Sequence, residues 1–154
     1  MSLIVEDGTG LPNSESYISA SSADDYHTKR GNAAWAALDA AAKEAFLRRG
    51  TEYIDAVYTF KGHRLTDAQA LAWPRDVEGV PLAVQRATAE LALRAINGDL
   101  MPDAGPQVKS ETVGPISVTY MDGASSFTSF SAVNSILASL LDESAYGQAR
   151  VIRS

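Results

Sequence analysis

The residues of this 154-residue chain that could do chemistry are few and far apart. The two histidines, His27 and His63, have no second histidine three or four residues further along that would make a helical metal pair. No Gly-x-Ser-x-Gly segment marks a nucleophilic serine, and cysteine is absent. The neighbouring acids Asp24–Asp25 and Asp142–Glu143 point apart on a helix, so they do not form an acid–base pair. We therefore expect no enzyme, no metal site and no cofactor.

Two stretches have some features of phosphate or base recognition. Gly8-Thr9-Gly10 has the glycine spacing of a phosphate-binding turn, but it lacks a third glycine or a lysine, which favours a simple turn. Tyr53, Tyr58 and Phe60, with the cations that follow them, could form a platform on which single-stranded bases stack. Tyr53 falls on the apolar stripe of a predicted helix, however, and this position favours the core.

The segment 69–75, Gln-Ala-Leu-Ala-Trp-Pro-Arg, is the most distinctive stretch of the chain. The proline disfavours the α conformation at Trp73, so the indole lies where a helix must stop. In one interpretation the indole fills the space between two long helices while Arg75 pairs with Asp76 or Glu78. In the other the corner forms a subunit contact, because tryptophan and arginine are enriched among interface hot spots.

Apolar periodicity predicts helices over most of the first hundred residues. Asp39 is a favourable N-cap for the strongest of them, in which apolar residues recur about every 3.6 positions. Beyond residue 102 the period changes to two, since Ile116, Val118 and Tyr120 alternate with other residues. This pattern favours a hairpin, with one long bent strand as the alternative. The expected helices are Ser22 to about Gly31, Ala40 to about Tyr58, Thr66 to Leu71, Pro81 to Gly98, and one beginning at Ser131.

The predicted fold class is mainly α (α+β). We expect a compact helical bundle with two long helices, shorter helices, a small β-hairpin and extended N- and C-terminal arms. The whole chain, 1–154, is expected to be one domain. Its expected parts are an extended arm (1–21), a helical body (22–101), the β-hairpin (107–121), a C-terminal helix (131–142) and an extended tail (143–154).

The charge of the chain disfavours binding to nucleic acid. The formal net charge is -6 at pH 7 and the sequence pI is near 4.8, so the overall field repels phosphate. The cations occur as short groups separated by acids, which is typical of solvated helix faces. No apolar run approaches the ~20 residues that a membrane-spanning helix needs, and we expect no membrane association. The lack of cysteine is compatible with a reducing cytoplasm.

Four stretches, taken in order, resemble a family of small proteins of tailed bacteriophages and prophages. They are LIVEDGTGLPNSESYIS, FKGHRLTDAQALAWPR, AVQRATAELALRAINGDL and VKSETVGPISVTY. Members of this family are labelled DnaT-like single-stranded-DNA-binding proteins. The chain is also similar to head–tail connector, or adaptor, proteins, which form a ring beneath the portal.

The connector resemblance implies a structural virion protein that joins portal to tail as a homo-oligomeric ring, twelvefold by family analogy. Its partners would be further copies of itself, the portal protein, and tail or head-completion proteins, with duplex DNA passing through the ring. It would reside in the virion, and in the host bacterial cytoplasm during assembly. Extended arms could bridge subunits by strand addition. The expected interface residues are Trp73, Arg75, Ile116, Val118, Tyr120, Arg150 and Arg153.

The DnaT-like label implies a different function, single-stranded-DNA binding in phage replication. Such a protein should have a basic groove with exposed aromatic side chains. Aromatic residues make up 8% of the chain and most fall at expected core positions, so the connector prediction is preferred and the DNA-binding prediction is the alternative.

Overall fold

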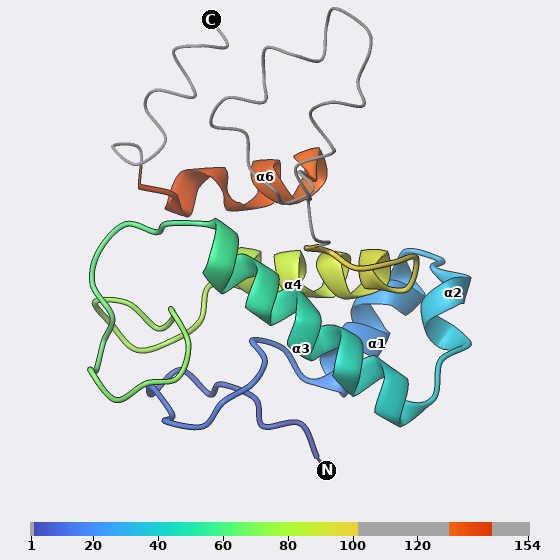
Figure 1. Cartoon of the computed structure of the whole chain (residues 1–154), viewed down its shortest axis with the longest axis horizontal. Helices are drawn as coiled ribbons and strands as arrows, with labels where there is room; N and C mark the ends of the chain where they lie inside the picture. Colours follow the sequence, from blue (N-terminus) through green and yellow to red (C-terminus); the bar gives the residue numbers. More distant parts are fainter. Residues whose placement is uncertain (1, 102–129, 143–154) are drawn as a thin grey trace, which may run out of the picture.

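The computed structural model describes residues 2–101 and 130–142 of the chain. This part is mainly helical, as predicted, and contains isolated β-bridges but no strand (Figure 1). The predicted hairpin (107–121) and tail (143–154) lie outside the described residues. No described helix is long and apolar enough to cross a bilayer. The elements are α1 (Ala20–Lys29), α2 (Ala33–Ala36), α3 (Ala40–Val57), α4 (Leu82–Ala95), α6 (Ser131–Leu137) and the 3-10 helix η2 (Ala138–Leu140).

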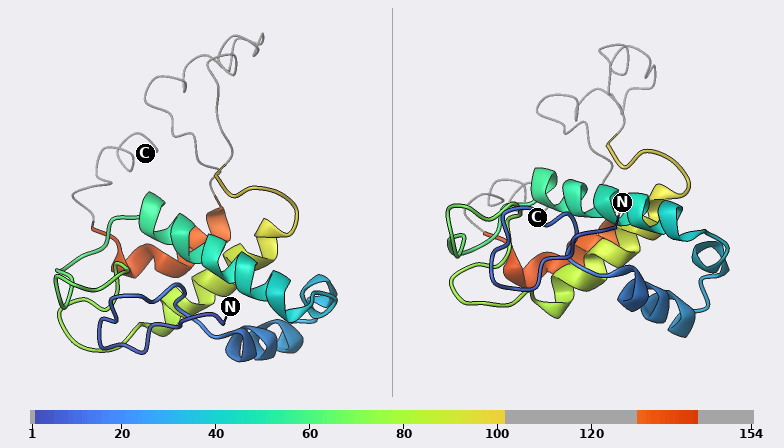
Figure 2. Two further views of the ribbon diagram at one scale, coloured as in Figure 1. Left: turned by 60° about the horizontal axis from the view of Figure 1, so that its bottom comes forward. Right: turned by 90° about the horizontal axis from the view of Figure 1, so that it is seen from below.

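Helices α3 and α4 pack against each other along much of their length (Figures 1 and 2). The side chain of Asp39 caps α3 by accepting a hydrogen bond from the Ala42 N–H at 2.8 Å, which confirms the predicted cap. Gly50 of α3 faces the backbone of α4 at close range. A Cβ atom at this position would be 2.9 Å from the Thr88 carbonyl oxygen and 3.3 Å from the Ala92 nitrogen. The helices can therefore approach this closely because residue 50 has no side chain.

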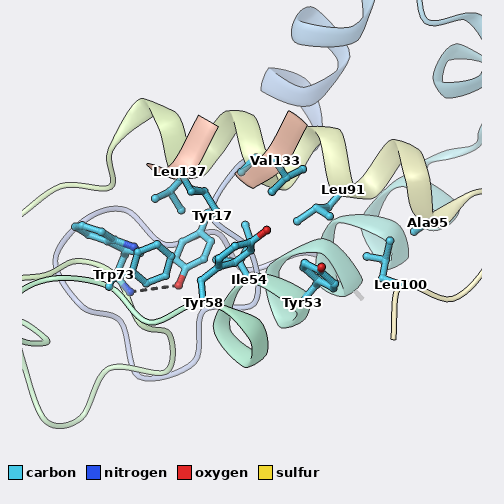
Figure 3. Packing of buried hydrophobic residues seen from close by; sticks show 13 residues of the cluster. Tyr17, Tyr53, Ile54, Tyr58, Trp73, Leu91, Ala95, Leu100, Val133 and Leu137 are labelled. Atoms are coloured by element: carbon cyan, nitrogen blue, oxygen red, sulfur yellow. Dashed lines mark hydrogen bonds between the residues drawn. The ribbon is translucent and has the colours of Figure 1, made fainter. Parts of the chain in front are cut away.

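The main hydrophobic core lies between α3, α4, α6 and the long loop 58–81 (Figure 3). Val133 and Leu137 of α6 are fully buried against α4 and α3. Tyr17 of the N-terminal arm enters the same cluster. A chain segment before the first helix thus supplies part of the core, which explains why the arm is ordered.

A second core cluster forms around Trp35 of α2, which the sequence analysis did not single out. The Trp35 side chain is 1% exposed, and it packs with Leu47 of α3 and Ala89 of α4. Its indole N–H donates to Asp24 Oδ1 of α1 at 2.8 Å. The four-residue helix α2 therefore fastens α1 to the α3–α4 pair.

Several predicted boundaries are wrong for local reasons. Helix α1 begins earlier than expected, because Ser19 is the cap and accepts from the Ser22 N–H. The C-terminal helix predicted over 131–142 ends at Leu137 and continues as η2. Its N-cap position is occupied by Phe130, without a side-chain capping bond, and Ser131 is the first helical residue.

The short helix predicted over 66–71 is absent, although Thr66 and Gln69 within it do contact each other. The Thr66 N–H donates to Gln69 Oε1 at 2.9 Å, and the Gln69 N–H donates to Thr66 Oγ1 at 3.0 Å. This reciprocal pair is a capping-box arrangement that closes a turn without a helix following it.

The close approach at Gly50 gives a stability prediction. Gly50→Ala should lower the free energy of unfolding by about 1 to 2 kcal/mol, because steric overlap with α4 outweighs the gain in helix propensity. Chemical denaturation measures this difference. At exposed Glu52 on the same helix, Glu52→Ala should be more stable than Glu52→Gly by about 1 kcal/mol, which calibrates the propensity term. A Gly50→Ala variant more stable than the original chain would refute the close packing.

Candidate functional site

The loop 58–81 carries the Trp-Pro-Arg corner and folds back on itself. Its two halves are joined by a bridge between Arg64 and Arg75, with the Leu65 N–H donating to the Pro74 carbonyl at 3.0 Å. Gln69 is 3% exposed and its side-chain amide donates to two carbonyl oxygens, those of Leu71 at 2.8 Å and Pro74 at 3.0 Å. A buried amide thus provides hydrogen bonds to backbone carbonyls in a loop that has no helix or strand.

Trp73 lies in the core and not on the surface. The Trp73–Pro74 peptide bond is cis, and the indole is 8% exposed. Its ring packs edge-on against Phe60, with ring centroids 5.3 Å apart, within the cluster that includes Leu137 (Figure 3). The indole Nε1 has no hydrogen-bond partner among the described residues. Packing is therefore the role that this position supports.

A buried network ties Trp73 to the N-terminal arm and to α3. The Tyr17 hydroxyl donates to Asp55 Oδ1 and accepts from the Trp73 N–H at 3.2 Å (Figure 3). The other carboxylate oxygen, Asp55 Oδ2, accepts from the Ala72 N–H at 3.2 Å. Three segments far apart in the sequence thus meet at one carboxylate.

Burial shapes the protonation of this network. It raises the pKa of Tyr17, with the nearby Asp55 carboxylate adding to the rise, so the hydroxyl keeps its proton and its donor role. Burial also raises the pKa of Asp55, while the hydrogen bonds from Tyr17 and Ala72 and the charge of Arg75 act in the opposite direction.

Arg75 is bound by the backbone of its own loop. Its guanidinium donates to the carbonyl oxygens of Lys61 at 2.8 Å, Gly62 at 2.6 Å and Ala72 at 3.1 Å. The predicted ion pair with Asp76 or Glu78 is not among the ion pairs of the described residues. Carbonyls of the folded loop compete better because they surround the guanidinium at fixed positions.

The turn Gly8–Gly10 binds an anion, but the anion belongs to the protein. The Glu6 carboxylate accepts hydrogen bonds from the Gly8 N–H at 2.9 Å, the Gly10 N–H at 2.8 Å and the Leu11 N–H at 3.0 Å. The Ser14 hydroxyl adds a fourth at 2.9 Å, and Glu6 is 4% exposed. Because these donors are already occupied, the turn has no free donors for a phosphate group.

The two histidines lie in different surroundings, one buried and one exposed. His27 is 1% exposed, and its ring nitrogens contact the Ala89 carbonyl at 3.0 Å and the Asn32 amide at 2.9 Å. Burial lowers the pKa of His27, which favours the neutral ring. His63 is exposed, and its backbone N–H donates to the Asp76 carboxylate. The described residues contain no group of three or more potential metal ligands.

The aromatic platform considered for single-stranded bases is not available. Tyr53, Tyr58 and Phe60 are 1%, 8% and 3% exposed, so their faces pack inside the protein. Tyr53 packs edge-on against Tyr58, with ring centroids 6.0 Å apart. These rings belong to the core because they lie on the apolar stripe of α3 and on the loop that covers it.

Nearly all basic side chains of the described residues are engaged within the protein. Five form ion pairs with carboxylates: Lys29, Lys43, Arg48, Arg49 and Arg94. Four donate to backbone carbonyls: Arg30, Lys61, Arg64 and Arg75. Arg86 is the described basic residue with neither kind of contact.

The predicted interface residues are only partly placed. Trp73 and Arg75 lie together at the corner, the first in the core and the second half-buried. Ile116, Val118, Tyr120, Arg150 and Arg153 lie outside the described residues, so an interface role for them stays a prediction. Neither the Tyr17–Asp55 pair nor the binding of Glu6 by its own turn was predicted from the sequence.

Comparison with known proteins identifies one family. Its model, described as "Putative DnaT-like ssDNA binding protein", matches residues 1–154. The chain belongs to this family. No curated protein and no solved structure matches the chain. The family description agrees with the alternative prediction, single-stranded-DNA binding, and the head–tail connector prediction is not part of it.

The Tyr17–Asp55 network predicts a measurable loss of stability. Tyr17→Phe should lower the free energy of unfolding by about 2 to 3 kcal/mol, because Asp55 loses a donor and the buried Trp73 N–H loses its acceptor. Chemical denaturation at neutral pH measures the change. Tyr26→Phe, which removes one hydrogen bond to the half-buried Glu90, is the matched control and should cost about 1 kcal/mol or less. Equal losses in the two variants would mean that the network does not tie the segments together.

Proposed function

We propose that the protein is a structural subunit of a tailed phage or prophage, a head–tail connector that forms a ring between portal and tail. The observation that carries this proposal is that the aromatic and basic side chains, which a nucleic-acid binder would expose, are buried or have partners within the protein. The aromatic residues of the 58–73 region are in the core, and nine described cations have intramolecular partners. The resemblance to connector proteins supports the same function.

The charge of the chain suits a conduit for DNA. With a net charge of -6, the protein makes few favourable contacts with phosphate, so duplex DNA can slide past it without being retained. In this proposal the partners are other copies of the chain, the portal protein, and tail or head-completion proteins. The protein would be found in virions, and in the host cytoplasm during assembly.

Single-stranded-DNA binding is the second candidate, and the family match favours it. The family description names this activity directly, and it supports the second candidate more directly than the connector. Among the described residues, a DNA-binding surface would draw on Arg86, the cation that is not engaged.

The connector proposal predicts assembly with portal. When the purified full chain is mixed with portal rings from the same genome, we expect it to co-sediment with them and to appear as an additional ring in electron micrographs. Bovine serum albumin at the same concentration serves as the control for non-specific sedimentation. A chain that stays monomeric and fails to bind portal would rule the connector out.

The two candidates also differ in DNA binding. We expect a fluorescently labelled deoxyoligonucleotide to bind more weakly than about 10⁻⁴ M at physiological salt, because the described cations are engaged and the net charge is negative. Fluorescence anisotropy at low and physiological salt measures the affinity. Tight binding with a steep salt dependence would establish the second candidate instead.

A further inference from the structure

Two large apolar side chains are strongly exposed among the described residues. Val77 is 71% exposed and Leu82 is 58% exposed. A single exposed apolar residue is common on protein surfaces and needs no explanation. These two differ from that ordinary case because Val77 has acidic neighbours whereas Leu82 has basic ones. Val77 lies between two acids, and Leu82 lines a groove with three cations.

The first surface is the acidic tip, residues Asp76–Gly79, all of which are exposed. Both of its ends are anchored. The Asp76 N–H donates to the His63 carbonyl at 2.9 Å, and the Gly79 N–H donates to the Gly8 carbonyl at 2.9 Å. Glu78 forms no hydrogen bond or ion pair with the described residues. The tip therefore presents Val77 and the Glu78 carboxylate on a short, well-anchored turn, at a low entropic cost of ordering.

The second surface is the basic groove, which lies between α1 and the beginning of α4 and has a volume of about 470 Å³. Lys29 and Arg30 line it from α1 and its C-cap, and Arg86 lines it from α4 beside Leu82. The Arg30 guanidinium stacks on the Tyr26 ring, 3.7 Å from its centroid. Tyr26 also belongs to the groove lining, so it provides a flat aromatic wall next to the cations.

The charges of the groove leave Arg86 open to a partner. The one acid in its lining, Asp25, pairs with Lys29 at 3.1 Å. Arg86 is exposed and has no ion pair or hydrogen bond within the described part of the chain. The groove therefore offers an unpaired guanidinium beside an exposed apolar side chain, and the tip offers an unpaired carboxylate beside another.

The acidic tip and the α1 wall of the groove lie in different parts of one molecule. Figures 1 and 2 show the loop 58–81 at one end of the helical body, and α1 and α2 toward the other. The α4 wall begins at Leu82, directly after the tip, so the contact between the tip of one copy and the groove of the next joins two neighbouring but different surfaces. It is heterologous when each copy uses its tip on one neighbour and its groove on another. Such heterologous contacts generate rings when the rotation between copies closes.

We propose that the acidic tip docks in the basic groove of a second copy of this chain, with Val77 against Leu82 and Glu78 paired with Arg86. The inference rests on the proposed connector function, because it supplies the contact between ring subunits. A protein segment with an apolar side chain fits the groove better than a phosphate backbone does, since Leu82 is strongly exposed beside the cations and the chain as a whole is acidic. The pairing of opposite charges at the rim sets the register of the contact.

Charge reversal at the two positions tests the proposal. Sedimentation velocity over a range of concentrations measures self-association of the full chain, alone and with portal rings. We expect Glu78→Arg and Arg86→Glu each to weaken self-association about tenfold or more, because each places like charges in contact. The double variant, Glu78→Arg with Arg86→Glu, restores opposite charges and should recover most of the lost affinity. Glu52→Arg, the same charge change on exposed α3, is the control and should behave like the original chain.

The outcomes separate this inference from the function on which it rests. Loss in both single variants with recovery in the double variant supports the docking. If the original chain assembles and the single variants assemble equally well, or the double variant does not recover, the docking is wrong while the connector function stands. If the original chain neither self-associates nor binds portal, both are wrong. If Arg86→Glu instead abolishes binding to a labelled deoxyoligonucleotide, the groove is a nucleic-acid site and the docking is again overturned.

Discussion

The half-buried carboxylate of Asp55 is the constraint on which the arrangement of the irregular segments depends. A carboxylate in this position needs hydrogen-bond donors, and α3 itself has none to spare. The Tyr17 hydroxyl and the Ala72 N–H supply them, so the N-terminal arm and the loop 58–81 must both reach the same point of α3. Because the Trp73 N–H donates to Tyr17 at this point, the Trp73 ring packs in the main core. The rest of the loop 58–81 lies at one end of the helical body.

The irregular segments use polar side chains in place of regular secondary structure. Glu6 accepts hydrogen bonds from the turn that follows it and from Ser14. Gln69 and Arg75 donate hydrogen bonds to backbone carbonyls of the loop 58–81. Each of these side chains satisfies backbone groups that would otherwise be buried without partners. The same use removes them as binding or catalytic groups, because their donors and acceptors already point inward. These three polar side chains therefore stabilise the fold of the described irregular segments.

What could be predicted from the sequence depended on how local the interaction is. The Asp39 cap was predictable because the acceptor and its donor are three residues apart, and Gly31 ends α1 with a positive φ of 70° for a similarly local reason. The partners of Arg75 and of Asp55 were not, because they come from segments that only the tertiary fold brings together. Trp35 was missed because its four-residue helix is too short to show a period, and its burial depends on α1, α3 and α4. For the candidate site, the sequence indicated the residues of the corner but not that the indole faces inward.

The net charge of a chain predicts little about its contacts when the charges are separated into patches. A total of -6 argues against a protein whose whole surface attracts DNA, yet it allows a groove with three cations at one place and an acidic tip at another. Self-association depends on whether two patches have opposite charge and complementary shape, and a protein that carries both patches can bind further copies of itself. Phosphate binding depends instead on the sum of the local field over many contacts. Since nine of the ten described cations are already held within the molecule, the one that is free contributes more to a single specific contact than to a field that could hold a DNA strand.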